Sequence, residues 1–459
     1  CGPTIYDHAH IGHAKVYVSF DTIVRYLRHL GYKVRYVQNI TDVGHLTDAD
    51  EGEDKILRRA ARDRVEPMEL VETYMRSYFE DMDALNVVRP NISPRPSCHI
   101  SEQIQLAELL LERGHAYEVN GSVYFDVAHW PEYGKLSRRK VEDQEAGARL
   151  VVNPDKRNPA DFAVWKKAEK GHILRWPSPW GWGYPGWHIE CSVMSTKYLG
   201  QPFDIHGGGL ENIFPHNECE IAQAEAATGK PFCNYWLLNN MVTVDGVQMG
   251  KSLGNAVYLK DLLTRHDPMT IRFFVLSSHY RSVTDFSETA LEAAHRGLGR
   301  LTGALSLIRE RLRDAEGDKV DAEWAAKVAG YRASFGEAMD DDFNTPRAIA
   351  TLFELSREAN ILLNSGQPVS RATLAAMDDL YRVLGGEVLG IRFDDLSQGG
   401  TGQDEGDLVA GLVRMLIDIR RAAREARNWS QADAVRDQLA EMSITLEDGP
   451  EGTRWRTSR

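Results

Sequence analysis

The hydrophobic pattern at the start of the chain changes from helical to extended spacing. Residues 12–30 place apolar side chains on one helical face and end at Gly31, which predicts a helix. Residues 33–40 (KVRYVQNI) alternate between polar and apolar, which predicts a strand, and residues 1–4 (CGPT) resemble a strand that ends in a loop. A strand, a crossover helix and a second strand begin a doubly wound parallel sheet, which binds ligands at the carboxyl ends of its strands.

A middle section interrupts this pattern, which then resumes. Residues 92–176 contain clusters of prolines and charges around a strand-like stretch at 122–126, and we interpret them as an insertion. Extended patterns return at 203–205 and 235–244, on either side of a predicted helix over 216–228 that Gly229 closes. The sheet is therefore expected to consist of two halves.

The second part of the chain is dominated by helical spacing. Asp267-Pro268 predicts a helix start with aspartate as the N-cap. From residue 287 onward, apolar residues step by three and four, and further helices are predicted from Thr345-Pro346 and over 374–384, which indicates a helical bundle. Residues 394–407 (DDLSQGGTGQDEGD) have the composition of a linker.

These patterns predict an α/β fold. We expect a doubly wound, Rossmann-like parallel-sheet domain with an insertion, followed by an α-helical bundle and a small C-terminal module. The expected divisions are the first half of the nucleotide-binding fold at 1–91, the insertion at 92–176, the second half of the fold at 177–245, a connecting region at 246–286, the bundle at 287–393, the linker at 394–407 and the final module at 408–459.

Composition places limits on the class of protein. A chain of 459 residues predicts about two to four domains, and it contains no apolar stretch of the length, about 18 residues, that would predict a membrane span. The formal net charge of −13 argues against a non-specific nucleic-acid binder but does not exclude a local basic surface. Five scattered cysteines favour a reducing compartment over a disulfide framework. The chain opens at Cys1 without a methionine or a signal pattern, so we expect some upstream sequence to be missing.

Two short motifs indicate phosphate chemistry. His10-Ile11-Gly12-His13 lies where the first strand turns into the first helix, a position that favours phosphate, and Gly12 would allow a planar base to lie against the backbone. Both histidines fall on one side of the first turn and can donate to phosphate oxygens as pyrophosphate departs. The alternative interpretation is a pair of surface histidines that cap a helix.

The second motif is Gln248-Met249-Gly250-Lys251-Ser252, in a predicted loop. A Walker A loop would require a glycine five positions before Gly250, where Asp245 stands, so no P-loop is present. Lys251 in such a loop can neutralise the charge that builds on a triphosphate. The alternative is a surface lysine in a turn.

Four residues have the types that bind borderline-soft metals: Cys1, Cys191, His216 and Glu220. His216 and Glu220 are four apart on one predicted helix, so their side chains share a face. Cys219, three residues after His216, is also a conceivable ligand on that face. No close C-x-x-C pair supports the set, so scattered residues without a metal are the alternative.

The two phosphate motifs, in this order, resemble the HIGH and KMSKS motifs of class I aminoacyl-tRNA synthetases. The first matches fully, whereas Gln248 and Gly250 depart from the second and leave Lys251 as its only lysine. Longer stretches resemble the cysteinyl-tRNA synthetase family; they are CGPT at 1–4, NITD at 39–42, GWHIECS at 186–192, DIHGGG at 204–209, FPH at 214–216, EDGP at 447–450 and TRWR at 453–456.

The resemblance implies a ligase that activates L-cysteine with ATP to cysteinyl-adenylate and transfers it to the 3′-terminal adenosine of tRNA(Cys). It implies one zinc ion per chain and Mg²⁺ with ATP, and it assigns zinc to Cys1, Cys191, His216 and Glu220, with no role for Cys219. A pocket that discriminates by size alone distinguishes near-isosteric amino acids only about 10–200-fold. Zinc, by contrast, prefers the thiolate of cysteine to the hydroxyl of serine. Metal chemistry would make a separate editing domain unnecessary.

The remaining site residues combine this resemblance, which implies the cysteine-binding residues, with the chemistry of the side chains and glycines themselves. Catalysis is assigned to His10, His13 and Lys251. ATP binding is assigned to Gly12, Gly207, Gly208, Gly209, Met249, Lys251 and Ser252. Cysteine binding is assigned to Thr41, Trp187 and His206, while Glu211 stands where the family often has aspartate. Anticodon recognition by the final module is assigned to Arg427, Trp429, Asp433 and Arg436, expected on one helix, where they can stack on and hydrogen-bond unpaired bases. An amphipathic surface helix is the alternative.

Other functions stay open at this point. A cysteine ligase of the mycothiol pathway shares the fold, the zinc site and the adenylate chemistry, but joins cysteine to an amino-sugar inositol and has no RNA for residues 408–459 to read. A catalytically dead regulator is disfavoured by intact His10, His13 and Lys251. A nucleotidylyltransferase would require neither the bundle nor four metal ligands. We expect a monomer in the cytoplasm.

Overall fold

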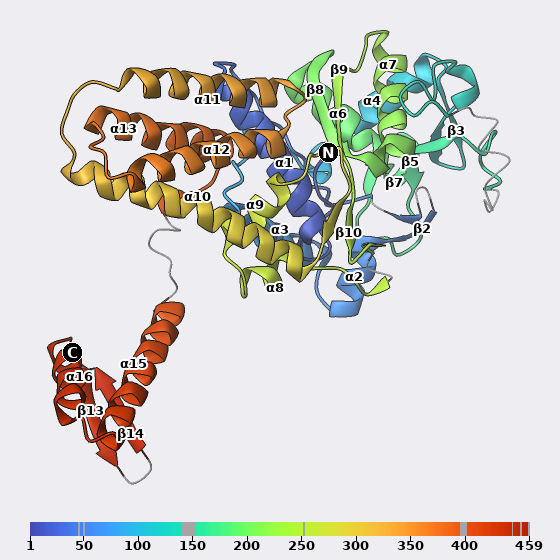
Figure 1. Ribbon diagram of the computed structural model, residues 1–459. Coiled ribbons are helices and arrows are strands. Elements are labelled where there is room, and N and C mark those ends of the chain that lie inside the picture. Colours follow the sequence, from blue (N-terminus) through green and yellow to red (C-terminus); the bar gives the residue numbers. More distant parts are fainter. Residues whose placement is uncertain are drawn as a thin grey trace. The chain divides into compact units, whose positions relative to one another are not determined.

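The structure is a computed structural model, shown in Figure 1, which describes residues 1–44, 46–48, 51–139, 153–250, 253–394, 402–442, 444–449 and 452–457. The chain divides into two compact units, Cys1–Ile391 and Arg392–Arg459. Among the helices of the described residues, none combines the length and the apolar character that crossing a membrane requires.

The first predicted helix is confirmed. Helix α1 (Ile11–His29) begins and ends one residue before the predicted bounds. Its apolar positions, among them Val18 and Ile23, are buried, which is why this spacing folds as a helix against the rest of the unit. Gly31 follows in a left-handed conformation, with φ of 91°, which ends the helix.

The predicted strand over 33–40 is wrong as a regular element. This segment runs parallel to residues 91–94, with a single bridge between Val37 and Ile92. The amide of Gln38 donates to the carbonyl of Ile92 (3.1 Å), and the amide of Ile40 donates to the carbonyl of Pro94 (2.9 Å). Pro94 has no N–H with which to continue the ladder, so regular pairing stops there.

Parallel pairing is present at the centre of the first unit. Strand β8 (Phe203–Gly209) pairs in parallel with β9 (Cys233–Asn239). The N-terminal segment lies beside β8, since the backbone nitrogen of Cys1 donates to the carbonyl of Gly207 (2.7 Å). On its other side, Thr4 forms a parallel bridge with Thr41. The α/β character is confirmed. Parallel pairing is present between β8 and β9 and in isolated bridges, and the doubly wound sheet stays a prediction.

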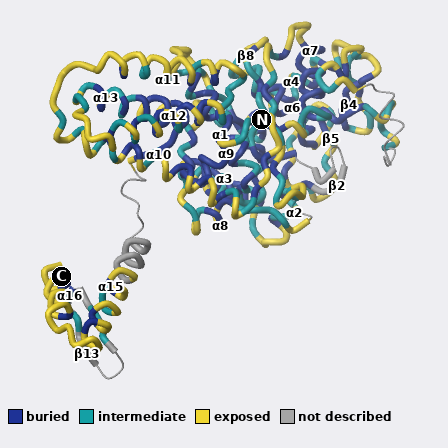
Figure 2. Tube along the Cα trace, viewed as in Figure 1, coloured by how far each residue is buried: buried dark blue, intermediate teal, exposed yellow. Residues whose placement is uncertain are grey.

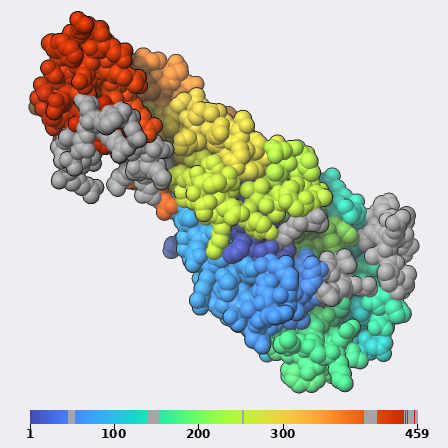
Figure 3. All heavy atoms as spheres, turned by 90° about the horizontal axis from the view of Figure 1, so that it is seen from below, coloured from blue at the N-terminus to red at the C-terminus, as the bar shows by residue number. Residues whose placement is uncertain are grey.

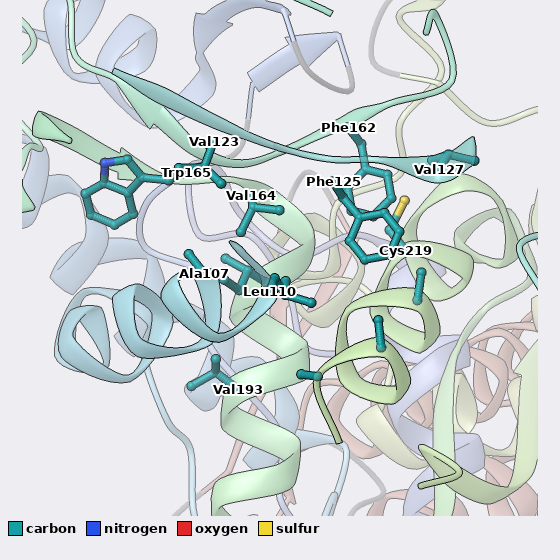
Figure 4. Packing of buried hydrophobic residues seen from close by; sticks show 14 of the residues in the cluster. Ala107, Leu110, Val123, Phe125, Val127, Phe162, Val164, Trp165, Val193 and Cys219 are labelled. Atoms are coloured by element: carbon teal, nitrogen blue, oxygen red, sulfur yellow. The ribbon is translucent and has the colours of Figure 1, made fainter. Parts of the chain in front are cut away.

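The predicted insertion contains an antiparallel sheet in the order β3-β4-β5-β7-β6. Its strands are β3 (Ala116–Val119), β4 (Ser122–Phe125), β5 (Phe162–Lys167), β6 (Trp176–Ser178) and β7 (Gly181–Pro185), so the sheet continues past residue 176. One face packs on helices α4 (Ile100–Glu112), α6 (Trp187–Leu199) and α7 (Glu218–Thr228). Figure 4 shows this core, in which the rings of Phe125 and Phe162 stack with their centroids 5.0 Å apart.

The helical bundle is confirmed. It consists of α10 (Glu288–Asp314), α11 (Ala322–Asp340), α12 (Thr345–Asn364), α13 (Arg371–Leu380) and a π-helical continuation, η6 (Tyr381–Val388). The hydroxyl of Ser287 caps α10 by accepting from the amide of Ala290 (3.1 Å). The apolar stripe of α10, including Leu291 and Leu301, is buried, and Figure 2 shows buried residues along the inner sides of α10, α12 and α13.

The other described elements of the first unit connect these parts. Helix α9 (Pro268–Leu276) begins as predicted, because the Asp267 carboxylate accepts from the amide of Met269 (2.7 Å). The rest are β1 (Leu46–Asp48), β2 (Glu51–Asp54), α2 (Lys55–Asp63), α3 (Pro67–Ala84), η1 (Pro96–Cys98), η2 (Val127–His129), η3 (Leu210–Asn212), η4 (Ile213–Asn217), β10 (Val242–Val244), β11 (Val247–Gln248), α8 (Leu259–Leu263) and β12 (Thr284–Phe286).

The second unit has two helices and a hairpin: α15 (Gly402–Glu425), α16 (Trp429–Glu441), β13 (Ile444–Gly449) and β14 (Gly452–Thr457). A small core of Val413, Leu439 and Ile444 joins them. Residues 402–407, expected in the linker, are helical instead. A polar composition with glycines does not exclude a helix, and these residues continue directly into the amphipathic residues of α15.

Candidate metal centre and nucleotide site

Four residues from separate elements converge in the first unit. Cys1 lies beside β8, Cys191 on α6, His216 in η4 and Glu220 on α7, and one ligand atom of each lies within 4.8 Å of all the others. We call these four residues the metal cluster. His216 was predicted on the same helix as Glu220. It lies instead in the π-helical turn that leads into α7, and still brings its Nε2 atom to 2.9 Å from Oε1 of Glu220.

The donor set of the metal cluster fits a zinc ion. Tetrahedral zinc with bonds of 2.0–2.3 Å holds its donor atoms about 3.3–3.8 Å apart. The Sγ atom of Cys1 lies 3.5 Å from Oε1 of Glu220, within that range, and the four ligand atoms all lie within 4.8 Å of one another. Cys191, His216 and Glu220 are each at most 5% exposed. Two sulfurs, one imidazole and one carboxylate are donors that zinc accepts.

Charges inside the metal cluster favour a cation. Burial raises the pKa of the Glu220 carboxyl, but the rings of His206 and His216 outweigh burial and hold that pKa well below its usual range. Burial lowers the pKa of His216, whereas the Glu220 carboxylate and Cys191 raise it, with a net value of about 9. An ionised carboxylate is therefore already present among the ligands, and metal binding would displace the proton of His216.

Two further residues orient the ligands, and the sequence analysis missed both. The Nδ1 atom of His188 lies 3.0 Å from Nδ1 of His216, on the side of the ring away from Glu220. The Nδ2 atom of Asn217 donates to Oε1 of Glu220 (3.0 Å) and to Sγ of Cys1 (3.7 Å). Each is adjacent to or near a ligand in the chain, which was the available signal. Partners of this kind hold a ligand in one orientation.

Cys219 does not belong to the metal cluster. Its side chain is fully buried in the core between the insertion and α7, as Figure 4 shows, and its sulfur lies 3.4 Å from the hydroxyl of Tyr133. Cys219 and Glu220 are consecutive on α7, so their side chains point about 100° apart around the helix axis and only Glu220 faces the cluster.

A pocket of about 230 Å³ joins the metal cluster to the first phosphate motif. Its lining includes Cys1, Cys191 and His216 of the cluster, His10 and His13 of the motif, and Thr41, Trp187, Gly209 and Glu211. The rings of Trp187 and His216 have centroids 4.3 Å apart. His206 lies outside this lining and contacts the cluster from another side, with Nε2 2.9 Å from Oε2 of Glu220.

A larger groove, about 660 Å³, lies on the other side of Cys1 and Cys191. Side chains of α1 such as Phe20 and Leu27 give it an apolar wall, and neither His10 nor His13 lines it. Of the expected catalytic residues that the structure describes, His10 and His13 line the smaller pocket, which is therefore the candidate active site.

The first turn of α1 brings both phosphate motifs together. The backbone amide of His10 donates to Nδ1 of His13 (3.1 Å), and the two rings stack with centroids 3.9 Å apart. A Cβ atom at Gly12 would lie 3.0 Å from the ring of His10 and 3.1 Å from Cε of Met249. Met249 of the second motif therefore lies against Gly12 of the first. Lys251 and Ser252 lie outside the described residues.

The Gly207-Gly208-Gly209 run forms the end of strand β8, where it was expected to follow the strand. A Cβ atom at Gly207 would lie 2.5 Å from the ring of Phe20, and one at Gly209 would lie 2.3 Å from the Glu211 carboxylate. Gly209 borders the active-site pocket, Gly207 borders the larger groove, and Gly208 lines neither. Close packing thus accounts for the glycines at 207 and 209.

In the second unit, three of the four expected RNA-binding residues share a helix. Trp429, Asp433 and Arg436 lie on α16 at positions that face one side, and all are exposed, Trp429 to 57%. Arg427 was expected on the same helix but precedes it, with φ of 56°. The reason is Asn428, whose side chain caps α16 by accepting from the amide of Gln431 (3.3 Å).

Three kinds of comparison relate the chain to known proteins. Residues 1–296 match the family described as tRNA synthetases class I (C) catalytic domain, and residues 334–394 match the DALR domain. Cysteine–tRNA ligase of Deinococcus radiodurans is 53% identical over 457 residues, which cover 99% of this chain and 91% of that protein. Cysteine–tRNA ligase of Thermus thermophilus is 50% identical over 461 residues, covering 100% of this chain and 94% of that protein.

Among solved structures, the fold is similar to that of Mycobacterium tuberculosis methionyl-tRNA synthetase in complex with methionyl-adenylate. The TM-score is 0.63 at 16% identity, over 84% of this chain and 90% of that chain. At this identity the similarity concerns the fold alone, and it covers most of the chain.

Proposed function

The chain belongs to the cysteinyl-tRNA synthetase family of class I, and from that premise we propose that it is a cysteine–tRNA ligase acting on L-cysteine, ATP and tRNA(Cys). The observation that carries the proposal is the convergence of the metal cluster, His10 and His13 on one pocket. The metal cluster would hold one zinc ion. Zinc held there would supply a preference for a thiolate over the hydroxyl of serine, if it accepted the thiolate of cysteine as a further ligand.

The proposed reaction has two steps. A carboxylate oxygen of cysteine attacks the α-phosphorus of ATP, the bond to pyrophosphate breaks, and cysteinyl-adenylate forms. A hydroxyl of the 3′-terminal adenosine of tRNA(Cys) then attacks the carbonyl carbon, and AMP leaves. His10 and His13 donate hydrogen bonds to phosphate oxygens in the first step, Lys251 neutralises charge on the departing pyrophosphate, and Mg²⁺ accompanies ATP.

Residues in and around the pocket have separate roles in this proposal. Trp187 and Thr41 border the amino acid near the metal cluster, and His206 supports the cluster through Glu220. Gly12, Gly209 and Met249 border the nucleotide at the first turn of α1. Because these groups lie in what we propose to be a Rossmann-like doubly wound domain, ATP would lie at the carboxyl ends of its strands.

The second unit supplies a surface suited to RNA. Trp429 presents an exposed aromatic ring beside the charged groups of Asp433 and Arg436 on α16, and such groups stack on and hydrogen-bond unpaired bases. We propose that this face reads the anticodon of tRNA(Cys). The five free cysteines of the chain suit an enzyme of the cytoplasm.

The test is ATP–pyrophosphate exchange, followed by charging of a tRNA with a GCA anticodon. We expect exchange with cysteine and none with serine at the same concentration, and charging of the tRNA but not of an amino-sugar inositol. A chain that ends at Ile391 should keep exchange and lose most of the charging. Charging of the amino sugar instead of tRNA would contradict the proposal, as would exchange that does not depend on cysteine.

A further inference from the structure

One side chain fixes the shape of the turn that carries the second phosphate motif. The Oδ1 atom of Asn255 accepts from the amide of Gly250 (2.9 Å), and its Nδ2 atom donates to the carbonyl of Gln248 (3.1 Å). The amide of Leu253 also donates to the carbonyl of Gly250 (3.0 Å). A single amide group thus satisfies one donor and one acceptor of the turn, and a change in the turn would break both hydrogen bonds.

The chain on each side of this turn is anchored. Before it, β10 and β11 form a hairpin in which Thr243 pairs with Gln248. After it, residues 257–259 pair with residues 9–11: the amide of Ile11 donates to the carbonyl of Val257, and the amide of Leu259 to the carbonyl of Ala9, both at 2.9 Å. In Figure 3 the yellow-green surface of the residues that follow 250 borders the blue surface of the first 90 residues.

The anchored turn places Met249 at the proposed nucleotide site. The Cε atom of Met249 would lie 3.1 Å from a Cβ atom at Gly12, on the first turn of α1 beside the ring of His10. Only the main-chain groups of Gln248 and Gly250 enter the contacts with Asn255. Asn255 therefore holds the turn without requiring the lysine and serine side chains that the family motif has at these two positions.

We propose that Asn255 is a positioning residue for ATP: it fixes the Gln248–Gly250 turn so that Met249 borders the nucleotide at Gly12. The inference rests on the proposed function for the identity of the nucleotide. Asn255 acts through Met249 and the main chain. Its hydrogen bonds to described residues go to Gly250 and Gln248 and not to the metal cluster, so we expect it to have no part in selecting cysteine.

The test compares Asn255→Ala and Asn255→Asp in the full chain by ATP–pyrophosphate exchange. We expect KM for ATP to rise about 5–50-fold in both variants. This range corresponds to the loss of one or two ordinary hydrogen bonds, which leaves the turn less ordered. KM for cysteine and zinc per chain should stay at wild-type values. Aspartate fills the volume of asparagine but cannot donate to the carbonyl of Gln248, so a residue that only fills space predicts wild-type KM for Asn255→Asp.

The matched control is Asn240→Ala. Asn240 also bridges two main-chain groups in this region, accepting from Met241 (2.8 Å) and donating to the carbonyl of Arg281 (2.9 Å), but it makes no contact with the turn. We expect its KM for ATP to equal that of wild type.

Two results would overturn the proposal. One is a wild-type KM for ATP in both Asn255 variants, and the other is a joint loss of zinc, cysteine affinity and ATP affinity, which would make Asn255 a purely structural residue. If the wild-type chain shows no cysteine-dependent exchange, the proposed function fails. The Kd of a non-hydrolysable ATP analogue, measured by calorimetry on the same variants, then decides the role of Asn255 by itself.

Discussion

The first unit contains two clusters of buried charge whose charged groups have different kinds of partner. One is the metal cluster. The other, which we call the α1–α9 joint, centres on Asp21 of α1 and Arg272 of α9, both with fully buried side chains that form an ion pair. Arg272 also donates to the main-chain carbonyls of Leu389 (2.7 Å) and Leu85 (2.9 Å). The joint thus ties α1 to the chain just before residue 391, where the first unit ends.

The two clusters differ in the side-chain groups that surround the buried carboxylate. In the α1–α9 joint, Asp21 accepts from Arg272, from Arg25 (2.8 Å) and from the amide of Val88 (2.8 Å), so both carboxylate oxygens have donors. In the metal cluster, Glu220 also has partners on both oxygens, but two sulfurs and an imidazole converge with it, so that one ligand atom of each residue lies within 4.8 Å of the others. Burial of charge alone therefore does not indicate a binding site; the convergence of several metal-binding side chains does.

The largest expected effect concerns Arg272→Met. The substitution leaves the Asp21 carboxylate buried without its main partner, so we expect the free energy of unfolding to fall by about 3–5 kcal/mol. Chemical denaturation followed by circular dichroism measures this. Zinc bound per folded chain should not change, because the joint and the metal cluster share no residue.

The control for Arg272→Met is Arg296→Met, on the exposed face of α10, where the side chain is 66% exposed and its pair with Glu292 spans 3.7 Å. Here we expect a change of about 0.5 kcal/mol or less. An Arg272 variant as stable as this control would mean that the joint is dispensable, and the comparison with the metal cluster would fail.

Next in size is Cys191→Ser in the metal cluster. Serine replaces a sulfur ligand with a poor oxygen donor. Loss of a partner that only orients a ligand lowers metal affinity about 10–100-fold, and we expect a larger fall here because a ligand itself is lost. Competition with a chelator measures the affinity. Cys98→Ser, at an exposed cysteine, should bind zinc as wild type does. Equal affinities in the two variants would remove Cys191 from the cluster.

The two clusters also differ in how far the sequence predicts them. The metal ligands lie in short stretches, such as GWHIECS around Cys191, whose resemblance to a family implies their role. Arg272 is visible only as an arginine inside an apolar helix, PMTIRFFVL, and its partner Asp21 is 251 residues away in the chain. Helical spacing predicts each helix, but not which helices meet, because that depends on tertiary packing.

The same reasoning separates the predicted elements. Caps and stripes are local, so α9 begins at the residue that Asp267 indicates and α10 follows its leucine stripe. The strand over 33–40 failed because its pairing depends on Pro94, which comes from another part of the chain. Arg427 precedes α16 because Asn428 caps the helix, and an asparagine in the sequence does not by itself show whether it caps a helix or lies within one.

A smaller effect is expected for His188→Leu, which removes the partner of His216 Nδ1 but keeps a side chain of similar volume in the core. We expect zinc affinity to fall about 10–100-fold, since the ring of His216 loses its orientation. The control is His99→Leu, another buried histidine, whose Nε2 lies 2.8 Å from the hydroxyl of Tyr198. If both variants lose zinc equally, the effect comes from stability and His188 has no role in orientation.

The smallest effect is expected for Arg25→Met, at the outer edge of the α1–α9 joint. Arg25 donates to the same oxygen of Asp21 that Arg272 binds, but its side chain is 16% exposed and water reaches the pair. Asp21 keeps Arg272 as a partner, so the free energy of unfolding should fall by only about 1 kcal/mol.

In the double variant, Asp21 loses both cations, and the combined loss should exceed the sum of the single losses by about 0.5–3 kcal/mol. Chemical denaturation of the three variants measures this coupling. If Arg25→Met lowers the free energy of unfolding as much as Arg272→Met does, then proximity to Asp21 and not burial decides how much each arginine of the joint contributes to stability.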